Sequence, residues 1–376
     1  MDALGLYIHI PFCLRKCAYC NFVSYPGRLD DIDRYIDALI GEARLYEELL
    51  QSRIIDSVFI GGGTPSLLSP AQMKKLIASL QSISAWENAE ITVEANPETL
   101  NEEKLSAYSE LGINRLSIGL QTHENAILHD IGRGHSWETF LHAFDLASHY
   151  FNNINVDIIF GLPGQTVKSF AETLKRLIEL SPTHMSAYAL KLETDTPLAK
   201  RYEGADEDID REMYHLAVDI LNQAGYTHYE TSNFAKPGYE CRHNLKYWMG
   251  EEYLGLGIAA YSYLKEGGGR RFGNTSAFDD YFQCISARKR PTCEDDWLTQ
   301  NDQIIEYIML RLRLNNGIDF DDYRRRFGGD LINDFADAVE FAQNAGLIIA
   351  DDKGIRPTLK GFDLQNALIG EFINKL

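Results

Sequence analysis

Short runs of β-branched and aromatic residues alternate with longer stretches of helical period over the first half of the chain. Six candidate strands occur in the order LYIHI, SVFIGG, ITVEAN, RLSIGL, NVDIIFG and HMSAYAL. The apolar spacing between them predicts helices at 31–51, 70–83, 101–111, 124–130, 136–150 and 166–180. Each strand and its helix form one βα unit, and such units build a parallel sheet. The sequence therefore predicts an α/β fold, a partial (βα)6 barrel that is open on one side.

The pattern changes twice in the rest of the chain. After an amphipathic helix in GADEDIDREMYHLAVDILNQAG comes a mixed α/β segment that contains the glycine run 267–269. From Thr299 onward three helices precede a short hairpin, LIIADDKGIRP, and a last helix, an order typical of a winged-helix-like module. We therefore expect a barrel over 1–225, a barrel-flanking segment over 226–298 and a C-terminal helical domain over 299–376.

The charge balance excludes one class of partner. The formal net charge is −19 at pH 7, and nucleic-acid binding requires a basic surface that displaces counterions from the phosphates. No apolar run approaches the length of a membrane span, and the residues after Met1 do not resemble a secretion signal. We predict a cytoplasmic protein that binds no nucleic acid.

Three cysteines crowd the loop after the first strand. Cys13, Cys17 and Cys20 have the spacing CxxxCxxC, at the carboxyl end of a strand, where parallel βα folds place their chemistry. Three thiolates can hold three irons of a [4Fe–4S] cluster and leave the fourth iron open to a ligand. The alternative is a zinc site with His9 as the fourth ligand. We interpret the scattered cysteines, Cys241, Cys284 and Cys293, as incidental.

The spacing of these cysteines resembles that of the radical S-adenosylmethionine (SAM) superfamily, in which the same loop follows the first strand of a partial barrel. The resemblance implies that SAM chelates the open iron and is cleaved by an electron from the cluster. FIGGGTPS ends the second strand and resembles the element of the superfamily that lies against the methionine amino group. Carried onto this chain, it nominates Gly62, Gly63 and Thr64.

Polar residues also occur at or just after the ends of later strands. Glu94 ends an apolar strand, where an unpaired buried charge is costly; the ribose hydroxyls of a nucleotide or a salt bridge inside the barrel could satisfy it. Gln121, Arg133 and Asp157 occupy comparable positions in RLSIGLQ, DIGRGH and NVDIIFGLPGQT.

Together these motifs resemble the porphyrin-related branch of the superfamily, which comprises oxygen-independent coproporphyrinogen III dehydrogenase and the HemW-type haem chaperones. YIHIPFC, GGGTPS, EANPE, RLSIGLQ, DIIFGLPGQT and the C-terminal module carry the resemblance. It implies that Tyr7, Gly62 and Glu94 attend the cluster-bound SAM. It also implies that a second SAM is attended by Gln121, Arg133, Asp157 and Ala189.

Three features separate the two members of this branch. The dehydrogenase has a further cysteine where this chain has Phe22, and a longer segment ahead of the first strand. In addition, RHNLKYW matches the HNxxYW motif that the resemblance associates with haem. His243 is then the candidate ligand of the haem iron, since neutral imidazole is a standard axial group, with Tyr247 and Trp248 against the macrocycle. A hydrogen-bonded, partly buried histidine is the alternative.

The resemblance thus favours a haem chaperone without dehydrogenase activity, whose partners are haem and haem-accepting proteins. Peripheral contact with membrane haem proteins is part of this expectation. The alternative is the enzyme itself, which removes two propionate carboxyl groups from coproporphyrinogen III by radical oxidative decarboxylation. The acidic C-terminal module is expected to be a lid or a docking surface.

Overall fold

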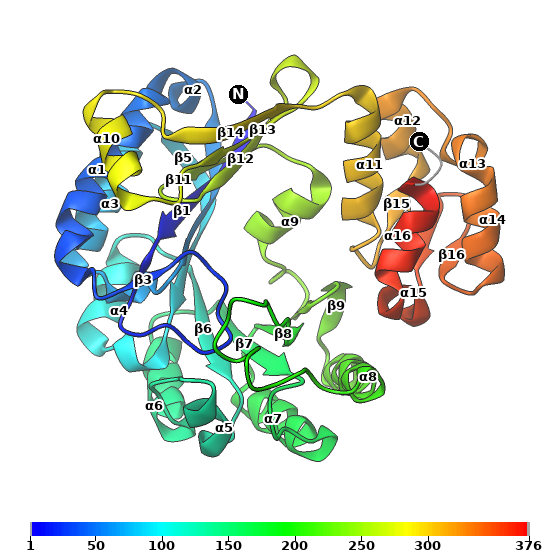
Figure 1. Cartoon of the computed structure of the whole chain (residues 1–376), viewed down its shortest axis with the longest axis horizontal. Helices are drawn as coiled ribbons and strands as arrows, with labels where there is room; N and C mark the ends of the chain where they lie inside the picture. Colours follow the sequence, from blue (N-terminus) through cyan, green and yellow to red (C-terminus); the bar gives the residue numbers. More distant parts are fainter. Residues whose placement is uncertain (1, 374–376) are drawn as a thin grey trace.

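The computed structural model describes residues 2–373, so residue 1 and residues 374–376, the outer ends of the ranges predicted above, lie outside the described residues. Its centre is a curved wall of six parallel strands (Figure 1). These strands are β1 (Ala3–Ile10), β4 (Ile54–Gly62), β5 (Ala85–Ala95), β6 (Arg115–Gln121), β7 (Ile154–Phe160) and β8 (His184–Ala189). The prediction of an open (βα)6 barrel is confirmed.

Helices cover the outer face of this wall. They are α1 (Ile32–Leu45), α2 (Glu47–Gln51), α3 (Pro70–Gln81), α4 (Glu102–Glu110), α5 (Asn125–Asp130), α6 (Trp137–Ser148), α7 (Val167–Leu180) and α8 (Glu207–Gln223). The predicted helix 31–51 is interrupted at Tyr46, whose backbone leaves the helical region and whose ring is buried against Phe272. The start of α3 is fixed by a capping box between Ser69 and Gln72.

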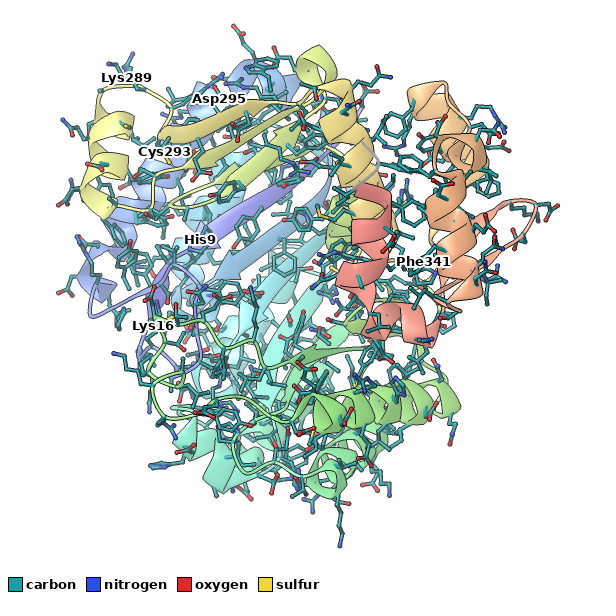
Figure 2. All side chains as sticks on the ribbon, turned by 45° about the vertical axis from the view of Figure 1, so that its right-hand side comes forward. His9, Lys16, Lys289, Cys293, Asp295 and Phe341 are labelled. Atoms are coloured by element: carbon teal, nitrogen blue, oxygen red, sulfur yellow. The ribbon has the colours of Figure 1, made fainter. Side chains whose placement is uncertain are left out.

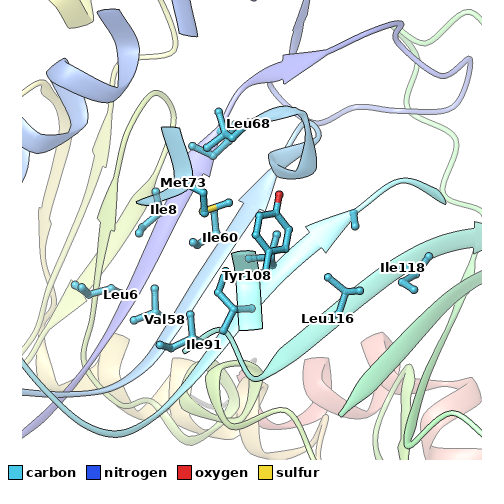
Figure 3. Packing of buried hydrophobic residues seen from close by; sticks show 14 of the residues in the cluster. Leu6, Ile8, Val58, Ile60, Leu68, Met73, Ile91, Tyr108, Leu116 and Ile118 are labelled. Atoms are coloured by element: carbon cyan, nitrogen blue, oxygen red, sulfur yellow. The ribbon is translucent and has the colours of Figure 1, made fainter. Parts of the chain in front are cut away.

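Alternate residues of each strand divide between the two faces of the wall. Leu6 and Ile8 of β1 and Val58 and Ile60 of β4 point outward and pack beneath the helices (Figure 3). The intervening residues, which include Tyr7 and His9, therefore face the inside of the barrel. The outer face supplies the apolar core, and the inner face remains available for polar side chains.

The segment 226–298 extends both edges of the same sheet. β10 (Asn233–Ala235) pairs with β8 and β9 (Thr227–Glu230) pairs with β10, both antiparallel. The other edge gains a strand parallel to β1 and then three antiparallel ones: β11 (Tyr253–Leu256), β12 (Tyr261–Leu264), β13 (Arg270–Asn274) and β14 (Thr292–Trp297). The result is a twelve-stranded sheet in the order β14-β13-β12-β11-β1-β4-β5-β6-β7-β8-β10-β9. α10 (Phe278–Ser286) packs against α1.

A helix crosses the inside of the barrel to connect these two edges. It is α9 (Arg242–Met249), which lies between the sheet and the C-terminal module (Figure 1). A Cβ on Gly5 would stand 2.9 Å from Lys246 Cδ and 3.3 Å from His243 Cε1, so this glycine permits the close approach of α9 to β1. Because Gly5 lies near the start of β1, α9 fills the amino-terminal end of the barrel.

The C-terminal module has a hydrophobic core of its own. It contains α11 (Gln300–Arg311), β15 (Ile318–Asp319), α12 (Phe320–Phe327), α13 (Leu331–Asp334), α14 (Ala336–Asn344), β16 (Ile348–Ala350), β17 (Gly354–Pro357), α15 (Leu359–Asp363) and α16 (Gln365–Ile373). The three strands form a small antiparallel sheet in the order β15-β17-β16. This confirms the winged-helix-like arrangement, and β16 and β17 are the wing.

The remaining elements are short. β2 (Phe12–Cys13) and β3 (Tyr25–Pro26) pair with each other, and 3₁₀ turns occur at Leu29–Asp31, Pro65–Leu67, Pro97–Thr99 and Glu266–Gly268. Within residues 2–373, no helix combines the length and the apolar character that crossing a membrane requires.

Candidate functional site

The three clustered cysteines lie beyond the carboxyl end of β1. Figure 2 shows His9 on that strand and Lys16 in the loop that follows it. The loop is fixed by two backbone hydrogen bonds of Ala18, whose N–H donates to Ile131 O (2.9 Å) and whose carbonyl accepts from Leu198 N (2.9 Å). Cys13, Cys17 and Cys20 are free thiols that line one cavity of about 140 Å³. The structure therefore brings the CxxxCxxC cysteines to one site.

Neighbouring donors are directed at two of these sulfurs. Thr64 Oγ1 donates to Cys13 Sγ (3.7 Å), and Arg133 Nη1 donates to Cys17 Sγ (3.7 Å). Burial raises the pKa of the Cys13 and Cys20 thiols, and the charge of the neighbouring Cys17 raises both further. Thiolates are therefore costly here unless a cation binds them, because burial disfavours the charged form.

His9 is not placed as a fourth ligand for zinc. Its Nδ1 is hydrogen-bonded to Tyr7 OH (3.0 Å) and its Nε2 to Val23 O (2.8 Å), so both ring nitrogens are occupied. No three His, Cys, Asp or Glu side chains of residues 2–373 converge on one ion position. A single zinc needs all its ligands around one point, whereas a [4Fe–4S] cluster takes each thiolate on a different iron. With both ring nitrogens hydrogen-bonded, His9 does not complete a zinc site in this structure.

Gly62, which ends β4, and Gly63, which follows it, lie directly against β1 and the cysteine loop. A Cβ on Gly63 would stand 2.6 Å from Phe12 O and 3.0 Å from Cys13 Sγ. Gly62 has φ +116°, a conformation that side chains rarely adopt, and a Cβ there would stand 2.6 Å from the ring of His9. The glycines are thus required by close packing of β4 against β1 and its loop.

Glu94 lies at the end of β5 and lines the same cavity. Its Oε2 accepts from Gly62 N (2.9 Å), and no described lysine or arginine forms an ion pair with it, so the salt-bridge alternative is not observed. Burial, and then the charge of Asp157, raise the pKa of this carboxyl to about 7, against the lowering effect of the Gly62 N–H. Oε1 has no hydrogen bond to another described residue, which leaves it available to a donor on a ligand.

The polar residues of the next strands adjoin this site. Asp157 accepts from Ser117 Oγ (2.9 Å) and Asn155 Nδ2 (2.8 Å), and Arg133 donates to Gly119 O (2.6 Å). Gln121 has φ +76° at a register shift between β6 and β7. Gln121, Arg133 and Asp157 all line the cysteine cavity.

A second cavity, of about 460 Å³, adjoins the first. Gln121 and Asp157 line both, and Ala189 lines only the second. The second cavity is more apolar, because Ile159, Tyr188 and Leu190 contribute to it. Phe22 also lines both cavities and is 69% exposed.

Two predicted site residues are not in these cavities. Tyr7 is hydrogen-bonded to His9 and stacks on Phe59 (ring centroids 6.3 Å apart), and burial raises the pKa of its hydroxyl. His243 lies at the opposite, amino-terminal end of the strands and is 0% exposed. Its Nδ1 is hydrogen-bonded to Ser57 Oγ (2.9 Å) and its Nε2 to Tyr247 OH (2.8 Å).

The environment of His243 corresponds to the hydrogen-bonded histidine that was the alternative to an iron ligand. Burial lowers the pKa of its imidazole to about 3, so the ring is neutral, but neither nitrogen is free. Ligation of iron by His243 therefore requires α9 to leave the position it has here.

Asn96 is a site residue that was not singled out from the sequence. Its Nδ2 donates to Thr64 Oγ1 (3.3 Å) and its Oδ1 accepts from Arg133 Nη2 (2.8 Å), so it connects the residues that contact Cys13 and Cys17. Its position directly after β5 could have identified Asn96 from the sequence, because polar residues at that edge of a parallel sheet lie close together.

The chain is similar to known proteins over its whole length. Residues 7–177 match the family described as "Radical SAM superfamily", and residues 298–364 match the "HemN C-terminal domain". "Heme chaperone HemW" of Lactococcus lactis is 35% identical, covering 98% of this chain and 96% of that protein. The protein of the same name from Bacillus subtilis is 34% identical, covering 98% and 99%.

A solved structure supports the same relationship. It is described as "Coproporphyrinogen III oxidase (HemN) from Escherichia coli is a Radical SAM enzyme" and superposes with a TM-score of 0.88 at 26% identity. The match covers 100% of this chain and 91% of that chain.

The position of His243 predicts a structural effect of its removal. The substitution His243→Ala should lower the free energy of unfolding by about 2–3 kcal/mol, because it leaves Ser57 and Tyr247 unpaired inside the protein. Urea denaturation measures this, with the exposed His142→Ala as the matched control. An unchanged free energy of unfolding in His243→Ala would contradict this structural role.

Proposed function

Since the chain belongs to the HemW family of the radical SAM superfamily, we propose that it is a haem chaperone, which binds haem and transfers it to acceptor proteins. The observation that carries the proposal is similarity to proteins of that name along nearly the full length of the chain, C-terminal module included. Phe22 adds support, because the dehydrogenase branch has a cysteine at this position. Haem is the cargo in this proposal, and the partners are haem-accepting proteins.

We further propose that Cys13, Cys17 and Cys20 hold a [4Fe–4S] cluster. The residues present fit this group: three thiols share one cavity, and Gly63 leaves room that a Cβ would fill beside Cys13. Thr64 and Arg133 donate toward the sulfurs of Cys13 and Cys17, which stabilises the thiolate form that ligation needs. When bound, such a cluster supplies the electron that cleaves SAM.

The remaining site residues are proposed to bind SAM. Gly62, Gly63 and Thr64 present backbone beside the cysteine loop for its methionine part, and Glu94 accepts hydrogen bonds from its ribose. Gln121, Arg133, Asp157 and Ala189 are proposed for a second SAM, and the adjoining cavity of about 460 Å³ supports that position for three of them. Tyr7 acts indirectly in this scheme, through its hydrogen bond to His9.

The proposed cellular location of the protein follows from the chemistry of the cysteines. Cluster assembly requires reduced thiols, so we propose a cytoplasmic protein, with peripheral contact where an acceptor is a membrane haem protein.

The chaperone function predicts haem transfer without porphyrinogen chemistry. Protein reconstituted anaerobically with iron and sulfide should bind haem in a Soret-monitored titration and pass it to an apo-haem protein. The same preparation, supplied with SAM, a reductant and coproporphyrinogen III, should form no protoporphyrinogen. Formation of protoporphyrinogen IX over multiple turnovers would refute the chaperone function and support the dehydrogenase alternative.

The cluster proposal predicts that only three of the six cysteines are needed to bind iron. Alanine at Cys13, Cys17 or Cys20 should abolish the broad absorption of the reconstituted cluster and reduce bound iron to background, because each thiolate holds one iron. Cys284→Ala and Cys293→Ala are the matched controls and should retain the full iron content. Iron retained in all three loop variants would rule out this ligand set.

Glu94 predicts a pH dependence of SAM affinity. Ribose hydroxyls stabilise the ionised carboxyl, whose pKa of about 7 in the free protein means that protonation opposes binding at lower pH. Affinity should therefore rise about tenfold from pH 6 to pH 8, as the ionised fraction of a group with this pKa does. The Glu94→Gln variant should not show this increase of affinity with pH, apart from the change that ionisation of SAM itself causes. If isothermal titration calorimetry gives the same change of SAM affinity with pH for the wild type and for Glu94→Gln, Glu94 is not the ribose acceptor.

A further inference from the structure

A row of polar side chains crosses the inside of the barrel from the cysteine cavity. The strand register places side by side one residue from each of β5, β6, β7 and β8, in the order Glu94, Ser117, Asn155 and His184. Glu94 and Ser117 line the cysteine cavity, whereas Asn155 and His184 line neither that cavity nor the adjoining one and are 2% and 0% exposed. His184 is thus a buried titratable side chain that the proposed cluster and SAM sites do not use.

Hydrogen bonds connect His184 to Asp157. Asp157 follows Asn155 by two residues on β7, so the two side chains lie on the same face of the strand. Asp157 Oδ1 accepts from Asn155 Nδ2 (2.8 Å) and Oδ2 from Ser117 Oγ (2.9 Å). Asn155 Oδ1 is hydrogen-bonded to His184 Nδ1 (2.6 Å), and His184 Nε2 to Tyr229 OH (2.7 Å). Because Asn155 and His184 are buried, bulk water cannot replace a lost partner between them.

The partners determine which atom donates in each of these bonds. Asn155 turns its Nδ2 toward Asp157, because its Oδ1 would meet another acceptor there. Oδ1 then needs a donor, and His184 supplies it from Nδ1–H. Burial lowers the pKa of His184 well below its usual range, so the ring is neutral and Nε2 accepts from the hydroxyl of Tyr229. Tyr229 in turn accepts from Cys241 N (3.2 Å), so every group along this line donates toward Asp157.

The ring of His184 restricts the amide of Asn155 more than the neighbouring serines do. Ser186 Oγ donates to Asn155 Oδ1 (3.2 Å), and Ser117 Oγ accepts from Asn155 Nδ2 (2.8 Å). A hydroxyl can donate or accept, so both serines are compatible with either orientation of the amide. A neutral imidazole whose Nε2 is occupied by Tyr229 can only donate from Nδ1. Apart from Asp157 itself, His184 is therefore the group that determines how Asn155 is turned.

We propose that His184 is a positioning residue for the ligand of Asp157, whose carboxyl it holds toward the two cavities by fixing the amide of Asn155. The inference rests on the proposed second SAM, for which Asp157 is one of the binding residues. His184 does not touch that ligand in this scheme. It acts only through the orientation of two side chains, and a buried network of this kind specifies one arrangement when all its members are paired.

Two substitutions separate the bond to Asn155 from the rest of the His184 ring. His184→Asn places an amide N–H where Nδ1 stands and keeps the donor, whereas His184→Gln places its amide near Nε2, keeps the bond to Tyr229 and loses the donor to Asn155. Both remove a buried ring and should lower the stability in urea to a similar extent.

The measurement is isothermal titration calorimetry of the reconstituted full-length protein with SAM. The binding event that is absent from Cys17→Ala is that of the cluster-bound SAM, and its affinity should be the same in the wild type and in both His184 variants. The other event should be weakened about tenfold in His184→Gln, the effect of losing one hydrogen bond. In His184→Asn it should be weakened about twofold at most, because the donor to Asn155 is kept.

His228→Gln is the matched control, because His228 is also buried (6% exposed) and hydrogen-bonded to a tyrosine, Tyr214 (3.3 Å), but lines neither cavity. It should leave both binding events unchanged. Asn155→Ala provides a second variant if His184→Gln does not fold, as judged by circular dichroism, and should weaken the same event at least as much.

Wild-type protein that binds a single SAM would refute the second SAM of the proposed function. If the wild type binds two, three results would overturn this inference alone. They are wild-type affinity for the second SAM in folded His184→Gln, wild-type affinity in Asn155→Ala, and an equal loss of affinity in His184→Asn and His184→Gln.

Discussion

The parallel register of β1 and β4–β8 is the constraint on which the rest of the structure depends. Ile10 lies opposite Gly62, Glu94 opposite Ser117, and Gly119 opposite Asp157. Neighbouring strands stand only about 4.8 Å apart, so residues that are separated by dozens of positions in sequence meet at one edge of the sheet. Pairing of the strands therefore brings together the cysteine loop, the glycines and Glu94, and no long connecting loop is needed for this.

A barrel with a polar inner face also buries polar groups at its other end, and α9 pairs with some of them. Glu90 accepts the backbone N–H groups of Arg242 and His243 (both 3.1 Å), which places a carboxylate at the amino-terminal end of the helix. Burial lowers the pKa of Arg115, which is 1% exposed, but the neighbouring Cys241 and then Glu90 raise it more, so the net shift is upward. Glu90 and α9 thus form a hydrogen-bonded network inside the amino-terminal end, and the cysteine cavity lies at the carboxyl end.

The C-terminal module completes the sheet edge that the barrel leaves open. Asn315 N donates to Tyr229 O (3.0 Å), and Thr231 N donates to Arg313 O (3.0 Å), so the segment after α11 pairs with the turn at β9. His215 on α8 adds hydrogen bonds to Asp363 on α15 (2.9 Å). These contacts hold the module against the β9 edge of the sheet and against α8.

Local sequence determined the helices and strands of this protein, and only the tertiary structure decided which polar residues line its cavities. Strand and helix signals are local, since the side-chain period and caps such as Ser69 are read within a few residues, and the parallel βα rule then places Cys13, Gly62 and Glu94 at one edge. The path of α9 could not be predicted, because it depends on the space above Gly5 and on the distant Glu90. That path buries His243 and turns Trp248 toward the module, since residues five positions apart on a helix point in different directions.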